Sequence, residues 1–196
     1  MRILGIIPAR ANSQRLPGKH LMPCGGRPLI EWTIDAADRS RALSAVLIST
    51  NDKDILDQYG GKARPDKLSG PNVSSEEVVQ SIIGTGSEWD AICLLQPTSP
   101  LRTADDIDHA IHMLYANYWA DAVVSYSPVR DFYGLHTNGA IYLTRTDTIE
   151  SGSFFGDRWL PYVMPAERSV DVDTQQDMAK ADSYLQSVRK SATIRT

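Results

Sequence analysis

Residues 3–19 read ILGIIPARANSQRLPGK and contain the signals that decide the fold. Ile3 to Ile7 form a nearly continuous apolar run that ends at Pro8, a pattern typical of a strand covered on both faces. A long polar loop rich in Arg, Gly and Pro then runs from residue 9 to residue 27. The stretch therefore predicts a buried strand followed by an exposed, positively charged loop.

Apolar runs alternate with amphipathic patterns along the rest of the chain. We expect strands at residues 45–48, 91–95, 122–125 and 139–143, and a short edge strand at 162–164. Helices are expected from Pro28, after Asp52, over residues 76–83, and after the capping residues Thr103 and Thr174. The last helix should reach about Val188, with residues 189–196 as a frayed tail. This alternation predicts a three-layer α/β fold with a mainly parallel sheet.

Length and charge exclude several classes of protein. The 196 residues suit one domain spanning 1–196, and 42% of them are hydrophobic, which excludes a disordered or collagen-like chain. With 20 Lys and Arg against 24 Asp and Glu, the formal charge is −4, which argues against a general nucleic-acid binder.

Three further features predict a cytoplasmic protein. Cys24 and Cys93 are far apart in sequence, form no metal-ligand pair and are expected to be reduced thiols. No run approaches the roughly 20 apolar residues of a membrane helix, so we expect no membrane partner. The first eight residues are too short for a signal peptide and carry no cleavage site.

The loop after the first strand has the composition of a phosphate-binding loop. Arg10, Arg15 and Lys19 lie within ten residues, and the hydroxyl of Ser13 adds a donor. The spacing is not that of a P-loop, which needs Gly at position 13 and Ser or Thr where His20 stands. The alternative is an ordinary exposed charged loop.

Asp171 and Asp173 form a candidate Mg²⁺ site. If their segment is extended, both side chains leave the same face, with Cα atoms roughly 6.5–7 Å apart. Two such carboxylates repel each other, and a divalent cation with oxygen ligands removes that conflict. The alternative is acidity at a helix start, and Asp177 is better explained as the capping partner of Thr174 than as a ligand.

Four ordered segments carry a family resemblance that covers nearly the whole chain. They are residues 7–19, LLQPTSPLR at 94–102, NGAIY at 138–142, and DVDT at 171–174 with Asp177. Together they resemble the CMP-sialic acid synthetases (acylneuraminate cytidylyltransferases) and the related CMP-Kdo synthetases. The resemblance implies a Rossmann-like nucleotidyltransferase fold.

The resemblance also implies an activity and its residues. Such enzymes transfer CMP from CTP to a hydroxyl of an acidic sugar, with Mg²⁺, and release pyrophosphate. Arg10, Lys19 and Asp173 are the implied catalytic residues, and Asp171 joins Asp173 as metal ligand. The implied nucleotide contacts are Arg10, Ser13, Lys19, His20, Arg64, Val73 through its backbone, and Ser75. The implied acceptor contacts are Gln96, Asn138, Tyr142, Phe154 and Phe155. As alternatives, Tyr142 belongs to the core and Phe154–Phe155 form a local hydrophobic clasp.

The sequence departs from the family at two places. His20 replaces the Asn that usually follows the Lys. Residues 126–137 are much shorter than the acceptor and dimerisation segment of full-length relatives, so the usual dimerisation arm is expected to be absent or reduced, and a homodimer stays open. Arg130 is a candidate replacement for a missing cation. The shortening keeps two alternatives open: transfer of CMP to another acidic acceptor, such as a phosphonate, and a nucleotide-binding homologue without turnover.

Overall fold

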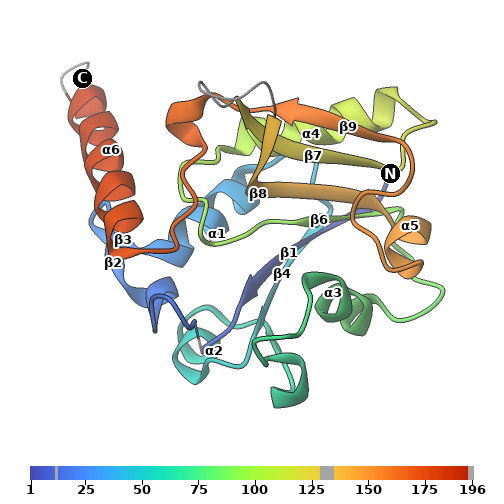
Figure 1. Cartoon of the computed structure of the whole chain (residues 1–196), viewed down its shortest axis with the longest axis horizontal. Coiled ribbons are helices and arrows are strands. Elements are labelled where there is room, and N and C mark those ends of the chain that lie inside the picture. Colours follow the sequence, from blue (N-terminus) through green and yellow to red (C-terminus); the bar gives the residue numbers. More distant parts are fainter. Residues whose placement is uncertain (12, 129–134, 194–196) are drawn as a thin grey trace.

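The computed structural model describes residues 1–11, 13–128 and 135–193, and its centre is a seven-stranded sheet within these ranges (Figure 1). The order across the sheet is β5-β4-β1-β6-β8-β7-β9. β8 runs antiparallel to β6 and β7, and the other neighbouring pairs are parallel, which confirms the predicted mainly parallel sheet. The strands are β1 (Ile3–Ala9), β4 (Ala45–Thr50), β5 (Lys62–Ala63), β6 (Ala91–Leu94), β7 (Ala122–Pro128), β8 (Leu135–Arg145) and β9 (Trp159–Val163).

β1 occupies the middle of the parallel part because its side chains are apolar on both faces. Ile6 and Ile7 are completely buried, and Ile6 pairs with strands on both sides. β1 continues through Pro8, two residues beyond its expected end. Pro8 is tolerated there because β6 pairs only as far as Ile6, which leaves one side of β1 open.

Helices cover both faces of the sheet and make the predicted three layers. Ile30 of α1, Ile55 of α2 and Ile107 of α4 share one apolar cluster on one face. Val79 of α3 and Ile149 of α5 belong to the cluster on the opposite face. The helices are α1 (Leu29–Arg39), α2 (Lys53–Tyr59), α3 (Ser75–Ile83), α4 (Ala104–Ala116), α5 (Thr146–Glu150) and α6 (Gln175–Thr193).

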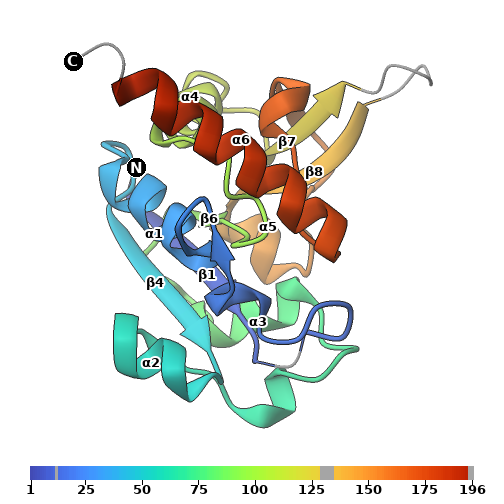
Figure 2. The ribbon, with the colours of Figure 1, turned by 90° about the vertical axis from the view of Figure 1, so that its left-hand side faces the viewer.

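α6 lies outside these layers, beside a small hairpin (Figures 1 and 2). The hairpin pairs β2 (Pro23–Cys24) with β3 (Arg27–Pro28), and its two-glycine turn has both central φ angles positive, as a type I′ turn requires. Asp182 of α6 accepts a 2.7 Å hydrogen bond from the turn. This docking matters for the site because α6 begins directly after the acidic pair.

Reciprocal capping contacts confirm two helix starts predicted from the sequence. The side chains of Thr103 and Asp106 each bond the other's backbone N–H at the start of α4. Thr174 and Asp177 do the same at the start of α6. Asp177 therefore acts as a cap, as expected, and it also accepts a 3.3 Å bond from the N–H of Asp173.

Two boundary predictions need correction. α1 begins at Leu29, and Pro28 belongs to the preceding hairpin strand. α6 continues to Thr193, five residues beyond its expected end, because residues 189–193 contain no Gly or Pro to stop it. In the described part of the chain, no helix has both the length and the apolar character needed to span a bilayer.

Candidate active site

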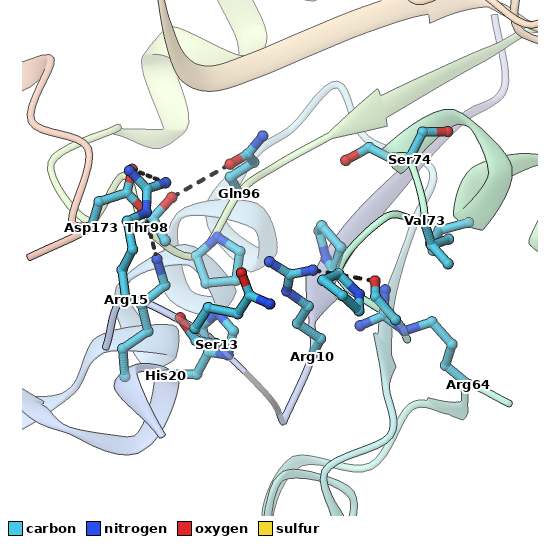
Figure 3. A pocket seen from close by; sticks show the side chains of 18 of the residues that line it. Arg10, Ser13, Arg15, His20, Arg64, Val73, Ser74, Gln96, Thr98 and Asp173 are labelled. Carbon is cyan, nitrogen blue, oxygen red and sulfur yellow. Dashed lines mark hydrogen bonds and ion pairs between the residues drawn. The ribbon is translucent and has the colours of Figure 1, made fainter. Parts of the chain in front are cut away.

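A cavity of about 630 Å³ lies beyond the carboxyl ends of β1 and β6, where ligands of open α/β sheets bind (Figure 3). Its walls come from the loops after these strands, from the start of α3 and from the segment before α6. The structure thus brings together segments that are far apart in sequence. Ten of the predicted site residues line the cavity: Arg10, Ser13, Lys19, His20, Arg64, Val73, Ser75, Gln96, Asp171 and Asp173.

One wall of the cavity carries a concentration of positive charge. Arg10 follows β1 and donates a 3.4 Å hydrogen bond to the carbonyl of Gly70. Arg64 is buried, and its Nε and Nη2 have no hydrogen-bond partner among the described residues. Burial and the neighbouring charge of Arg10 lower the pKa of Arg64. Buried donors without a partner are costly, so this wall is suited to an anion that would accept from them.

Lys19 connects the first loop to the acidic pair. Its side chain is only 8% exposed, and Nζ donates to the carbonyl of Val172 at 2.8 Å and to Oδ1 of Asp173 at 3.0 Å. Arg15 approaches the other oxygen, with Nη2 2.7 Å from Oδ2 of Asp173. Figure 3 shows Arg15 and Asp173 on the same side of the cavity. Two cations therefore hold one carboxylate at the edge of the cavity, 154 residues from Lys19 in sequence.

Asp171 is the carboxylate without a full set of partners. Its Oδ1 is buried and has no hydrogen-bond partner among the described residues. Burial is the main cause that raises its pKa, and the charge of Asp173 adds to it, whereas a hydrogen bond from Thr98 opposes the shift. A buried carboxylate oxygen of this kind fits a cation ligand.

The two carboxylates suit a metal that takes its other ligands from a substrate. In the described ranges there is no group of three His, Cys, Asp or Glu side chains that could hold a metal ion by itself. Mg²⁺ is commonly bound through one or two carboxylates together with substrate phosphates and water. The residues present therefore fit Mg²⁺ that arrives with a phosphate ligand.

His20 is a neutral residue in the cavity wall. Burial is the largest cause that lowers its pKa, and the charges of Lys19 and Arg64 act in the same direction, so the value falls to about 4. The imidazole is therefore uncharged near pH 7. It can still donate or accept one hydrogen bond at each ring nitrogen.

This depressed pKa predicts how stability varies with pH. Because the unfolded chain binds a proton at His20 near its ordinary value of 6.5, acidification favours the unfolded state between pH 6.5 and 4. We expect His20 to reduce the free energy of unfolding by about 2 kcal/mol between pH 7.5 and pH 5. Urea unfolding of the wild type and of His20→Asn at both pH values tests this. An equally steep loss in the variant would contradict the assignment.

The start of α3 forms the wall opposite the first loop. Ser74 caps the helix, and its side chain accepts from the N–H of Glu77 while that of Glu77 accepts from the N–H of Ser74. Ser75 is the first helical residue, and the N–H of Val73 donates to the carbonyl of Gly70 at 3.3 Å. This wall therefore presents the N-terminus of α3 and Val73 to the cavity.

The predicted acceptor residues divide into two groups. Gln96 follows β6 and lines the cavity. Asn138 is buried outside that lining, and its amide is used within the protein: Oδ1 accepts from Ser125 and Ala140, and Nδ2 donates to Ser169 and to Met164 Sδ. These contacts leave no donor or acceptor of the amide for an acceptor sugar.

Tyr142, Phe154 and Phe155 form an aromatic cluster next to the cavity and outside its lining. The ring centroid of Tyr142 lies 5.6 Å from that of Phe154 and 6.2 Å from that of Phe155. Phe154 is 3% exposed and belongs to the core, which agrees with the alternative of a local hydrophobic clasp. Tyr142 remains close enough to the cavity for the charges of Asp171 and Glu76 to raise its pKa, although burial is the main cause.

Some residues of the cavity were not assigned a role from the sequence. Thr98, Glu76 and Arg15 line it, and of these the sequence indicates only Arg15, as a cation of the first loop. The available signal for Thr98 was its place in the loop that follows a buried strand, four residues after the end of β6. Residues 129–134, which belong to the short segment 126–137 and include Arg130, lie outside the described residues.

Comparisons with known proteins agree on one family. A family described as Cytidylyltransferase matches residues 4–138. The CMP-N,N'-diacetyllegionaminic acid synthase of Legionella pneumophila is 30% identical, over 95% of this chain and 97% of that protein. The N-acylneuraminate cytidylyltransferase of Escherichia coli is 28% identical over 94% of this chain, which spans only 52% of that protein.

A solved structure shows the same fold. The CMP-2-keto-3-deoxy-manno-octonic acid synthetase complexed with CTP superposes with a TM-score of 0.74 over 100% of both chains, at 17% identity. The alignment with the Legionella protein runs over 227 residues, more than the 196 of this chain, so that relative contains segments that are absent here. Fold, family match and full-length similarity agree that the chain belongs to the cytidylyltransferase family.

Proposed function

We propose that this chain transfers CMP from CTP to a hydroxyl of an acidic sugar, a nonulosonic or ulosonic acid, and releases pyrophosphate. The observation that carries the proposal is a single cavity with cationic side chains on one wall and two carboxylates on another. A triphosphate needs several cations held close together, and a divalent cation needs carboxylate oxygens. The arrangement therefore suits a nucleoside triphosphate with its metal ion.

The relatives support the class of acceptor. The Legionella relative is named for CMP-N,N'-diacetyllegionaminic acid and the E. coli relative for N-acylneuraminate. Both names refer to nonulosonic acids, which carry a carboxylate that distinguishes them from neutral sugars. An acceptor of this class fits a cavity that is rich in cations.

The proposed reaction places the charges of the cavity around the α-phosphorus. The acceptor oxygen forms a bond to the α-phosphorus and loses its proton, while the bond from this phosphorus to pyrophosphate breaks. Arg10 and Lys19 hold the triphosphate and stabilise the negative charge that develops, because such transfer depends mainly on positioning and electrostatics. Ser13 adds a donor, and His20, Arg64, Val73 and Ser75 bind the nucleoside.

Asp171 and Asp173 are the proposed ligands of Mg²⁺. The partnerless Oδ1 of Asp171 supports this role, since a buried acceptor without a donor suits a cation. When bound, Mg²⁺ would neutralise phosphate charge as a Lewis acid. Asp173, now paired with Lys19 and Arg15, would exchange these ion pairs for the metal when the phosphates attract both cations.

Gln96 is the proposed contact of the acceptor. It lies in the cavity on the same side as Thr98, whose hydroxyl oxygen is 3.5 Å from Gln96 Oε1 (Figure 3). Tyr142 and Phe155, which are only partly buried, would provide an apolar surface beside it, with Phe154 packed behind them in the core.

The test measures pyrophosphate release from CTP with a panel of acids. We expect turnover with at least one 2-keto sugar acid, and loss of turnover when EDTA removes the metal. Neutral sugars of similar size serve as controls because they lack the carboxylate. Turnover only with a phosphonate would favour the other acidic acceptor. Binding of CTP by calorimetry without pyrophosphate from any acid would overturn the proposal in favour of a nucleotide-binding homologue.

We also propose that the protein works in the cytoplasm. Cys24 and Cys93 are both buried free thiols, which suits a reducing compartment. The homodimer stays a prediction, and analytical ultracentrifugation would decide it.

A further inference from the structure

The segment that carries the acidic pair is held to the sheet by side chains that the proposed reaction does not use. We define residues 164–173 as the acidic strap, which runs from the end of β9 to the start of α6. The strap continues the chain after the edge strand and ends in Asp171 and Asp173. Its backbone is held near its end, where the N–H of Val172 donates to the carbonyl of Thr98 at 2.7 Å.

Asn138 contacts this strap from a break in the sheet. The pairing of β7 with β8 is irregular between Val124 and Tyr126, and Ser125 lies at the irregularity. The hydroxyl of Ser125 donates to Asn138 Oδ1 at 2.6 Å and accepts the N–H of Ile141 at 2.7 Å. Side chains therefore replace ladder hydrogen bonds at this point, and Asn138 is held in one orientation.

The other end of the amide reaches the strap. Nδ2 of Asn138 donates to the hydroxyl of Ser169 at 3.0 Å and to Sδ of Met164 at 3.3 Å. Ser169 lies two residues before Asp171. With both lone-pair directions of Oδ1 and both protons of Nδ2 in use, the amide binds the protein rather than a substrate.

Gly139, next to Asn138 in β8, brings the backbone of this strand close to Asp171. Its φ is +74°, and a Cβ built there would lie 3.6 Å from Oδ2 of Asp171 and 3.7 Å from Oε1 of Gln96. Fixing Asn138 therefore also fixes the backbone that borders Asp171. Asn138 is thus linked to the surroundings of Asp171 both through Ser169 and through the backbone at Gly139.

A second anchor holds the neighbouring residue of the strap. Nη1 of Arg168 donates to Oδ2 of Asp106 at 2.8 Å, and the hydroxyl of Tyr162 donates to Oδ1 at 2.9 Å. Asp106 is 1% exposed and is fixed at the start of α4. Arg168 and Ser169 are thus fastened to α4 and to β8 respectively, which restrains the strap before it reaches the acidic pair.

From this geometry we infer that Asn138 is a positioning residue, which holds Asp171 through Ser169 for metal binding, and not a residue that contacts the acceptor. The inference rests on the proposed function only in taking Asp171 and Asp173 as metal ligands. Partners that orient ligating carboxylates commonly change metal affinity about tenfold or more when they are removed.

The test measures Mn²⁺ binding in the presence of CTP, without acceptor, by the EPR signal of free Mn²⁺. We expect the dissociation constant of Mn²⁺ to rise about tenfold in Asn138→Ala and about fivefold in Ser169→Ala. Ser169→Thr retains the hydroxyl and should restore wild-type binding. Ser151→Ala removes a comparable 2.7 Å bond, from Ser151 to the carbonyl of Thr148, and should change nothing.

Steady-state kinetics, with an acid that the wild-type protein turns over, complete the test. At saturating metal, the KM for the acceptor should stay within about twofold of wild type in Ser169→Ala. Ser169→Ala also covers the case in which Asn138→Ala fails to fold. Unchanged Mn²⁺ binding in Ser169→Ala, or a large rise in acceptor KM at saturating metal, would overturn the inference. Turnover of no acid by a wild type that binds Mn²⁺ with CTP would overturn the proposed function alone.

Discussion

Lys19→Ala is expected to lower kcat by at least about a hundredfold while the protein remains folded. Nζ of Lys19 is buried in the cavity wall and lies 3.0 Å from Asp173, where the triphosphate and the metal are proposed to meet. A cation is worth far more in such a water-poor site than at the surface. The measurement is pyrophosphate release at saturating CTP and metal, together with the melting temperature.

Lys53→Ala is the matched control for this substitution. Lys53 is exposed at the start of α2 and lies outside the cavity lining, so its removal makes the same change in net charge without touching the site. We expect its kcat to match the wild type. Near-wild-type turnover in Lys19→Ala would refute the phosphate assignment.

Asp173→Asn is expected to raise the Mg²⁺ concentration for half-maximal activity at least about tenfold. The substitution keeps the shape of the side chain and removes its charge, which is the property that a hard cation requires. Some loss of stability is expected as well, because Lys19, one of the two ion-pair partners of Asp173, is only 8% exposed and loses a charged partner, so the melting temperature is measured beside the activity. A metal titration at saturating CTP measures the effect.

Asp66→Asn provides the control for a lost carboxylate. Asp66 is exposed and lies in sequence between Arg64 and Leu68, which line the cavity, but it does not line the cavity itself. Its metal titration should coincide with that of the wild type. If Asp173→Asn gives the same curve as Asp66→Asn, Asp173 is not a metal ligand.

Local patterns in the sequence were sufficient to predict the buried strands and most of the helices. The apolar run at Ile3 to Ile7 predicted a buried strand, and β1 is an interior strand of the sheet, between β4 and β6. The Thr103 and Thr174 caps predicted two helix starts because a capping box is formed by residues only three apart. The rule that ligands bind at carboxyl ends of strands placed the first loop and Gln96 in one site.

The roles of side chains where β7 meets β8 were harder to predict from the sequence. Asn138 was predicted to contact the acceptor, yet its amide bonds Ser125 and Ser169, which lie 13 and 31 residues away. Phe154 was assigned to the same pocket and is buried in the core. A motif shows that a residue type is present, whereas its partners depend on which segments pack against it.

The sequence alone determined the buried strands of the sheet, the helices other than α5, two helix caps, and the presence of a cationic loop and a pair of carboxylates. These properties follow from neighbouring residues and from the periods of strand and helix. Only the tertiary structure decided that Lys19 meets Asp173 and that the acidic strap is fastened to β8 and α4. Contacts between distant segments depend on packing and hydrogen-bond satisfaction across the whole fold, which no local pattern specifies.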